Sequence, residues 1–186
     1  MVKRLFDLTL ALLLSLPALI IVALAVLAVS LDSAGSPFFK QVRVGRNRKP
    51  FTLVKLRTMA SGTRSAPSHE IGTDAITRVG AFMRRSKIDE LPQIWLVLTG
   101  AMSFVGPRPC LPSQGQLIAE RDRLGVYSAR PGITGVAQLA GVDMSTPVEL
   151  AQIDAGYVTG QSLLGDLKIL LATLLGRGMR DAVTPA

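Results

Sequence analysis

The feature that most constrains this chain is an uncharged apolar segment near its N-terminus, which runs from Leu8 to Leu31. As a helix at about 1.5 Å per residue, a segment of this length reaches about 36 Å, enough to cross a bilayer core of about 30 Å. A cleaved signal peptide does not fit, because the apolar region of a signal peptide is typically about 7–15 residues long. The segment therefore predicts a helix that enters a membrane.

Two further features favour a helix that enters the membrane and returns to the same side. Pro17 removes one backbone hydrogen bond inside the segment and kinks a helix, and Ser15 can bond a carbonyl in the preceding turn. Basic residues, which favour the cytoplasmic side of a membrane, flank the segment at both ends. They are Lys3 and Arg4 before it, and Lys40, Arg43, Arg46, Arg48 and Lys49 after it. We predict a re-entrant membrane helix over residues 1–35, broken near Ser15 and Pro17, with a straight transmembrane span as the alternative.

The rest of the chain, residues 36–186, is expected to form one domain with an anionic partner. The 186 residues include 21 Lys and Arg against 13 Asp and Glu, a net charge of +8. Such an excess attracts nucleic acid, anionic lipid and phosphorylated small molecules. Aromatic residues are only 5% of the chain, which is few for the stacking platforms of single-strand binders, so we expect no nucleic-acid partner. The single cysteine, Cys110, excludes an internal disulfide, and the single histidine, His69, lies in a polar stretch typical of a solvated loop.

The apolar patterns of residues 36–186 predict an α+β fold that is mainly helical. Short apolar runs on both sides of residues 45–48 predict a β-hairpin that is dense in basic residues. Helices are predicted from near Thr77 or Arg78, over Gln93 to Thr99, from about Ser113, over Pro147 to Tyr157, and over Ser162 to Arg177. The last of these has a broad Leu/Ile face, so it is expected either in the core or as an amphipathic helix in the membrane interface.

An adjacent carboxylate pair, Asp89-Glu90, is flanked by basic residues on both sides. Arg84, Arg85 and Lys87 precede it, and a Gly-Pro-Arg-Pro turn that holds Arg108 between two prolines follows it. Ser86 and Pro92 predict that a helix starts here, which places both acids at the positive end of its dipole. Two interpretations stay open. The pair either caps a helix, or it acts on an anionic substrate. In the second case one acid contacts a phosphorus atom or a metal, and the other transfers a proton.

Three motifs around this pair, SKIDELPQ, GAMSFVGPRP and RPGITGVAQ, resemble those of the bacterial sugar transferase family. The similarity extends along nearly the whole chain through KRLFD, FKQVRVGRN, KLRTM, ITRVGAFMRRS and DLKIL. The resemblance implies a monotopic phosphoglycosyl transferase of the short form, with a re-entrant helix and a small cytoplasmic catalytic domain. Such enzymes move a sugar-1-phosphate from a UDP-sugar to polyprenyl (undecaprenyl) phosphate at the cytoplasmic face of the bacterial inner membrane, and release UMP.

The resemblance also assigns roles to individual residues. It implies that Asp89 is the nucleophile that forms a covalent phosphosugar intermediate and a contact of Mg²⁺, and that Glu90 assists in proton handling or metal placement. A carboxylate can carry a phosphoryl group as an acyl phosphate, and Mg²⁺ neutralises a diphosphate. The substrate-binding positions implied by the family are Arg43, Lys55, Arg84, Arg108, Arg130 and Asp154, the last in a D-x-x-Y pattern with Tyr157.

The chain departs from the family pattern at four places. Ala101 stands where the family has Asp, and Leu96 where an Asn is common. The helix-break motif reads Ser15-Leu16-Pro17 instead of adjacent Ser-Pro, and residues 140–142 replace a usual Asn-Gly-Arg. Two rival hypotheses accompany the enzyme, the first because of the charge and the anchor and the second because of Ala101. One is a membrane-tethered module that binds anionic lipid or nucleic acid, and the other is a catalytically weakened relative of the family.

Overall fold

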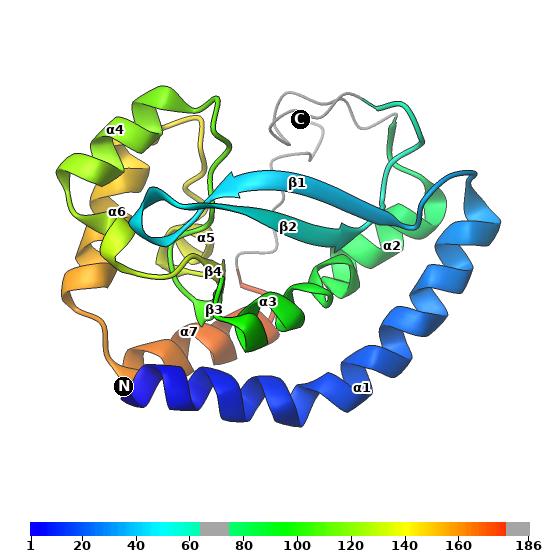
Figure 1. The fold of residues 1–186 in the computed structure, drawn as a ribbon, viewed down its shortest axis with the longest axis horizontal. Helices are drawn as coiled ribbons and strands as arrows, with labels where there is room; N and C mark the ends of the chain where they lie inside the picture. Colours follow the sequence, from blue (N-terminus) through cyan, green and yellow to red (C-terminus); the bar gives the residue numbers. More distant parts are fainter. Residues whose placement is uncertain (64–74, 178–186) are drawn as a thin grey trace.

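The computed structural model describes residues 1–63 and 75–177, and Figure 1 shows how they are arranged. A long helix, α1 (Val2–Asp32), curves along one side of the molecule, and a β-hairpin lies on the other, with α2 (Arg78–Ser86) and α3 (Gln93–Thr99) between them. The remaining elements are β1 (Phe38–Val44), β2 (Pro50–Leu56), β3 (Ser103–Val105), α4 (Gly115–Arg123), β4 (Gly132–Thr134), α5 (Val136–Ala140), α6 (Pro147–Thr159) and α7 (Leu163–Leu174). The described part is thus a mainly helical α+β fold, as predicted. His69, which is predicted to lie in a solvated loop, is outside the described residues.

The apolar N-terminal segment forms one continuous helix that contains Pro17, and this helix bends about half-way along its length (Figure 1). A re-entrant path through the membrane with a break near Ser15 and Pro17 stays a prediction. The Ser15 hydroxyl donates to the carbonyl of Ala11 at 2.6 Å, within the turn that precedes the proline. A proline removes a single N–H from the ladder, and the intact turns on either side keep the helix going. By length and composition α1 is a helix that can cross a membrane.

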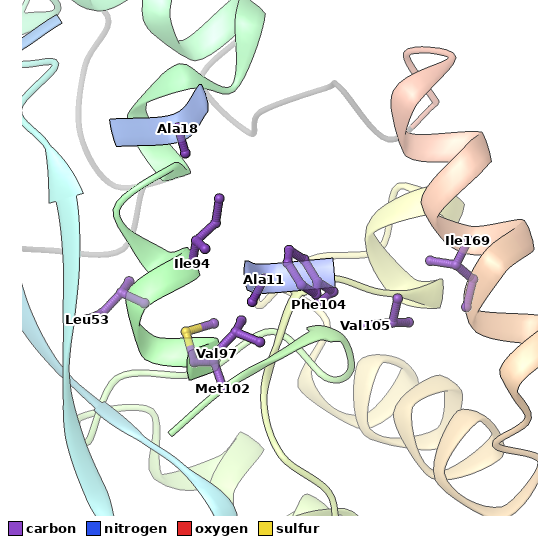
Figure 2. Packing of buried hydrophobic residues seen from close by; sticks show 9 residues of the cluster. All are labelled: Ala11, Ala18, Leu53, Ile94, Val97, Met102, Phe104, Val105 and Ile169. Carbon is purple, nitrogen blue, oxygen red and sulfur yellow. The ribbon is translucent and has the colours of Figure 1, made fainter. Parts of the chain in front are cut away.

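One face of α1 is packed against the rest of the protein and the other faces carry exposed leucines. The buried positions are Asp7, Ala11, Ala18, Ala25 and Val29. Alanines on this face let the backbone of α1 approach α3 closely. Figure 2 shows Ala11 and Ala18 beside Ile94 and Val97 of α3, in a core that continues to Ile169 of α7. Outward-facing side chains such as Leu13, Leu16 and Leu24 are exposed, so most of the apolar surface of α1 has no protein partner among the described residues.

Polar contacts attach both ends of α1 to the same domain. At the N-terminal end Arg4 donates to the carbonyls of Val97 and Leu98, at 2.6 and 2.9 Å, and so satisfies the last turn of α3. At the C-terminal end Arg57 donates to the carbonyls of Ser33 and Ala34, at 2.6 and 2.7 Å. The ends of this long helix are therefore tied to one body.

The predicted hairpin is confirmed: β1 and β2 pair antiparallel, with Gln41 opposite Leu53. Its turn contains two residues in the left-handed region, Asn47 and Arg48. A second pairing was not predicted, because β3 and β4 are only three residues each and β4 lies in a segment that reads as a loop. These strands run parallel, with Ser103 opposite Gly132. A Cβ atom on Gly132 would lie 2.1 Å from the backbone nitrogen of Gly106, so this close approach requires glycine.

Candidate active site

The carboxylate pair lies in a short 3-10 turn, Ile88–Glu90, between α2 and α3, and not in the first turn of a helix. The predicted helix start at Ser86 is wrong. Ser86 ends α2, and its hydroxyl donates back to the carbonyl of Phe82 at 2.9 Å. The helix begins only at Gln93, after Pro92. Lys87, in the left-handed region at φ 57° and ψ 16°, turns the chain between α2 and the carboxylates.

Glu90 is buried and binds two cations through one carboxylate oxygen. Oε1 accepts from Lys55 Nζ of β2 and, at 3.1 Å, from Arg108 Nη2 of the Gly-Pro-Arg-Pro loop. Burial alone would raise the pKa of Glu90, but the positive charges of Lys55, Arg108 and Lys87 outweigh it and hold that pKa well below its usual range. Glu90 is therefore a carboxylate at any physiological pH, and Asp89, also buried, is its neighbour in the same turn.

Arg43 of β1 extends this basic cluster. Its Nη1 donates to the carbonyl of Pro109 at 3.0 Å, and its Nη2 donates to Gln41. Burial, together with the positive charge of Arg108, lowers the pKa of the Arg43 guanidinium to about 10, so it stays protonated at neutral pH. The described residues around the turn thus include four cations, Arg43, Lys55, Lys87 and Arg108, and two carboxylates, a surplus of two positive charges. An anion with at least two negative charges balances such a site.

The other predicted site residues lie further out. Arg84 of α2 is attached to the end of β2, because its Nε donates to Thr58 Oγ1 at 2.9 Å. Arg130 lies at the opposite end of α3 from the carboxylates, where its Nε donates to the carbonyl of Gly100 at 2.9 Å. Burial, with the nearby cations Arg46 and Arg4, lowers the pKa of Arg130. Its observed contact stabilises the C-terminus of α3.

Asp154 is buried in an ion pair, and its predicted contact with substrate stays a prediction. Its Oδ2 accepts from Nε and Nη2 of Arg121, at 2.9 and 2.6 Å. Tyr157, its partner in the D-x-x-Y pattern, serves a different set of contacts. The Tyr157 hydroxyl lies 2.8 Å from Asp166 Oδ1 and 3.0 Å from the carbonyl of Val105. The two residues of the pattern therefore support different parts of the fold.

The sequence did not predict that Arg121 is buried in an ion pair or that Lys87 turns the chain before the carboxylates. Arg121 lies in the segment AERDR, where alternating charges are typical of a solvated helix face, and yet its side chain is buried. No local signal identifies it, because its counter-ion is 33 residues away. Lys87 had a signal, its place in the basic cluster before Asp89, but nothing in the pattern shows its left-handed backbone.

Comparison with known proteins decides the family. The sequence model of the bacterial sugar transferases matches residues 1–178. The chain belongs to the bacterial sugar transferase family. UDP-glucose:undecaprenyl-phosphate glucose-1-phosphate transferase of Caulobacter vibrioides is 41% identical over 182 residues, which cover 92% of this chain and 68% of that protein.

Two more relatives show how widely the family varies in length. An uncharacterized sugar transferase of Bacillus subtilis is 40% identical over 172 residues, 92% of this chain and 85% of the relative. UDP-glucose:undecaprenyl-phosphate glucose-1-phosphate transferase of Escherichia coli is 33% identical over 187 residues, 94% of this chain but 39% of the relative. The chain is thus a transferase, and its similarity to the family extends over nearly all of its length.

In this sugar transferase the residues around the turn suit one kind of metal. Among residues 1–63 and 75–177 no group of three or more His, Cys, Asp or Glu side chains is placed to hold an ion. Mg²⁺ needs no such cage, because it is usually held by one or two carboxylates together with substrate phosphates and water. Asp89 and Glu90 are the two carboxylates of this turn, and Glu90 pairs with Lys55 and Arg108.

Proposed function

We propose that this protein transfers a sugar-1-phosphate from a UDP-sugar to undecaprenyl phosphate. In the first step a carboxylate oxygen of Asp89 attacks the β-phosphorus of the UDP-sugar, the bond from this phosphorus to the bridging oxygen breaks, and UMP leaves. In the second step a phosphate oxygen of undecaprenyl phosphate attacks the same phosphorus and restores the Asp89 carboxylate. The observation that carries this proposal is the carboxylate pair surrounded by a surplus of cations, in a chain whose named relatives act on these substrates.

Glu90 is the group that orients the cations in this mechanism. Since Lys55 and Arg108 hold its pKa low against the effect of burial, Glu90 stays ionised and is a poor proton donor. Its work is to hold the Lys55 ammonium and the Arg108 guanidinium at one point, beside the phosphates they bind. The acceptor needs little help from a base, because the second pKa of a phosphate monoester is about 6.

Asp89 would hold Mg²⁺ together with phosphate oxygens of the donor, and the bound ion would neutralise charge on the diphosphate. Arg108 and Lys55 also neutralise charge on the diphosphate. Arg108, on a loop stiffened by two prolines, binds phosphate with little loss of side-chain and backbone entropy. Lys55 approaches from β2, which is paired with a second strand and so is fixed in place.

The membrane arrangement that fits this reaction is monotopic. Both ends of α1 are tied to one domain, by Arg4 at the start and Arg57 at the end, which is what a helix that enters and leaves through one leaflet requires. Exposed leucines of α7 (Leu164, Leu167 and Leu171) fit the membrane interface. The basic flanks of α1 favour the cytoplasmic face of the inner membrane, where a UDP-sugar is available.

The test is the pair Asp89→Asn and Asp122→Asn, compared in transfer of labelled sugar phosphate from a panel of UDP-sugars to undecaprenyl phosphate with Mg²⁺. Asp89→Asn should fold normally and lose turnover by at least about 10³-fold, because an amide oxygen is a far weaker nucleophile than a carboxylate. Asp122 is half-exposed in the pair with Arg48 and serves as the control, with activity unchanged. Omitting the acceptor should leave a labelled phosphosugar on Asp89. Turnover by Asp89→Asn would refute the covalent mechanism, and no transfer from any donor would favour a binding module.

A further inference from the structure

The ion pair between Arg121 of α4 and Asp154 of α6 also makes a contact with the active-site loop. Two nitrogens of the guanidinium, Nε and Nη2, bind Asp154 Oδ2. The remaining one, Nη1, donates to the backbone carbonyl of Arg108 at 2.9 Å. Arg108 is therefore held from both sides, with its side chain on Glu90 and its carbonyl on Arg121.

Three consecutive carbonyls of this loop each accept one hydrogen bond from a different part of the chain. The carbonyl of Pro107 accepts from the backbone of Gly132 at 2.9 Å, that of Arg108 from Arg121, and that of Pro109 from Arg43 at 3.0 Å. Because prolines have no N–H to donate, the loop is attached to the rest of the protein mainly through hydrogen bonds to these carbonyls. The central contact is the one nearest the Cα of Arg108.

We propose that Arg121 is a positioning residue for the transfer reaction, aligned by Asp154, and that it directs the Arg108 guanidinium toward Glu90 and the substrate phosphates. This inference rests on the proposed function. Asp154 then acts through Arg121 and not by touching substrate, since it is buried and its Oδ2 already accepts two N–H groups. The role needs the planar fork of arginine, because a lysine ammonium cannot reach Asp154 and the Arg108 carbonyl in the same geometry.

Arg121→Lys tests this role, because it keeps the charge opposite Asp154 and gives up the bond to the loop. We expect kcat to fall by about 10–100-fold with less than about 3-fold change in KM for the UDP-sugar, since a small displacement of a group that binds the transferred phosphoryl acts on the transition state. Arg123→Lys is the matched control on the same helix. Arg123 bonds Glu120 on the surface, and its change should leave both parameters as they are.

A double variant separates positioning from general support of the fold. In an Arg108→Lys background the guanidinium that Arg121 directs is absent, so adding Arg121→Lys should lower kcat by less than about 3-fold further. If the two losses multiply fully, Arg121 acts by another route and the proposal is wrong. Asp154→Asn, which keeps the shape and one acceptor oxygen, is the second variant if Arg121→Lys proves unstable, and it should show the same loss of kcat and the same lack of additivity.

Crystal structures of the wild type and the Arg121→Lys variant give a readout that does not depend on activity. The Arg108 guanidinium should move beyond hydrogen-bond distance of Glu90 in the variant. If it stays in place, the positioning role is refuted even where the enzyme transfers sugar phosphate normally. If the wild type transfers nothing, the proposed function fails, and the displacement of Arg108 alone decides whether Arg121 positions it.

Discussion

Glu90 and Asp154 are both buried carboxylates paired with basic side chains, and Arg108 lies between them, but their surroundings differ. Asp154 faces one guanidinium, and the side chains of this pair are 2% and 4% exposed. Glu90 faces several cations, and those that bind it, Lys55 and Arg108, keep 18% and 33% of their side-chain surface exposed. The first centre is balanced and sealed, and the second is positive and open. Balance and burial suit a structural role, whereas a surplus of accessible charge suits an anionic ligand.

Removing the cation of the sealed centre is expected to give the largest loss of stability. Arg121→Ala leaves the Asp154 carboxylate buried without its guanidinium, so we expect the free energy of unfolding to fall by about 3–5 kcal/mol. Denaturant unfolding in detergent, followed by the signal of Trp95, measures it. The control is Arg123→Ala, which breaks a surface pair on the same helix and should cost less than about 1 kcal/mol. Equal effects of the two variants would show that the buried Arg121–Asp154 pair stabilises the fold no more than a surface pair does.

Removing a cation from the open centre is expected to affect activity far more than stability. After Lys55→Ala, Glu90 keeps its contact with Arg108, so we expect the free energy of unfolding to fall by less than about 2 kcal/mol. The rate of transfer should fall by about 10²-fold, because a cation that stabilises charge on the transferred phosphoryl is gone. Initial rates with labelled UDP-sugar measure this loss. A stability loss as large as that of Arg121→Ala would show that Lys55 is a structural residue.

The open centre could be predicted from the sequence to a greater extent than the sealed one. Asp89, Glu90 and Arg108 lie close together in the chain, and the hairpin that carries Arg43 and Lys55 follows from its apolar pattern and its turn. The interpretation of Asp154 as a substrate contact stays a prediction that its ion pair with Arg121 does not favour. That pair joins two helices, and only the packing of α4 on α6 brings its members together. A long-range pairing of this kind leaves no local pattern of charge or periodicity.

The fold shows the same division between local and long-range effects. Helix α3 and its end at Gly100, which adopts φ 87°, follow from composition and from glycine's freedom in the left-handed region. The parallel pairing of β3 with β4 does not, because Gly106 and Gly132 touch across 26 positions of the sequence. Pro17 illustrates an intermediate case. Its position predicts a disturbance of α1, but whether the helix breaks or bends depends on the buried contacts of Ala11 and Ala18 with the domain.

The pH dependence of stability offers a finer test of the open centre. The pKa of Glu90 is lower in the folded than in the unfolded state, so its ionised form stabilises the fold fully above the unfolded value of about 4.3. This contribution is lost as the pH falls through the folded-state pKa. The stability difference between the wild type and Glu90→Gln should therefore be constant from pH 5 to pH 8 and shrink below about pH 4. Denaturant unfolding at each pH measures it. A difference that shrinks between pH 5 and pH 7 would contradict the assignment of Glu90 as a permanent anion.

The smallest expected effect concerns Lys87, whose left-handed backbone aligns the turn of the open centre. A residue with a Cβ atom loses about 1 kcal/mol in this conformation relative to glycine, so Lys87→Gly should raise the free energy of unfolding by up to about 1 kcal/mol. The same change removes a cation that lowers the pKa of Glu90, and transfer should slow by about 10-fold. Thermal unfolding and initial rates, measured on one preparation, show both effects together.

Lys87→Arg is the matched control for this prediction, because it keeps both the positive charge and the Cβ atom. Its stability and most of its activity should equal those of the wild type. If Lys87→Gly transfers at the wild-type rate, the cation at this position does not serve the phosphates, and the positive surplus of the open centre is smaller by one. If Lys87→Gly is less stable than Lys87→Arg, the contacts of the side chain at this position outweigh the cost of its left-handed backbone. The prediction that backbone strain at Lys87 lowers the stability of the protein is then wrong.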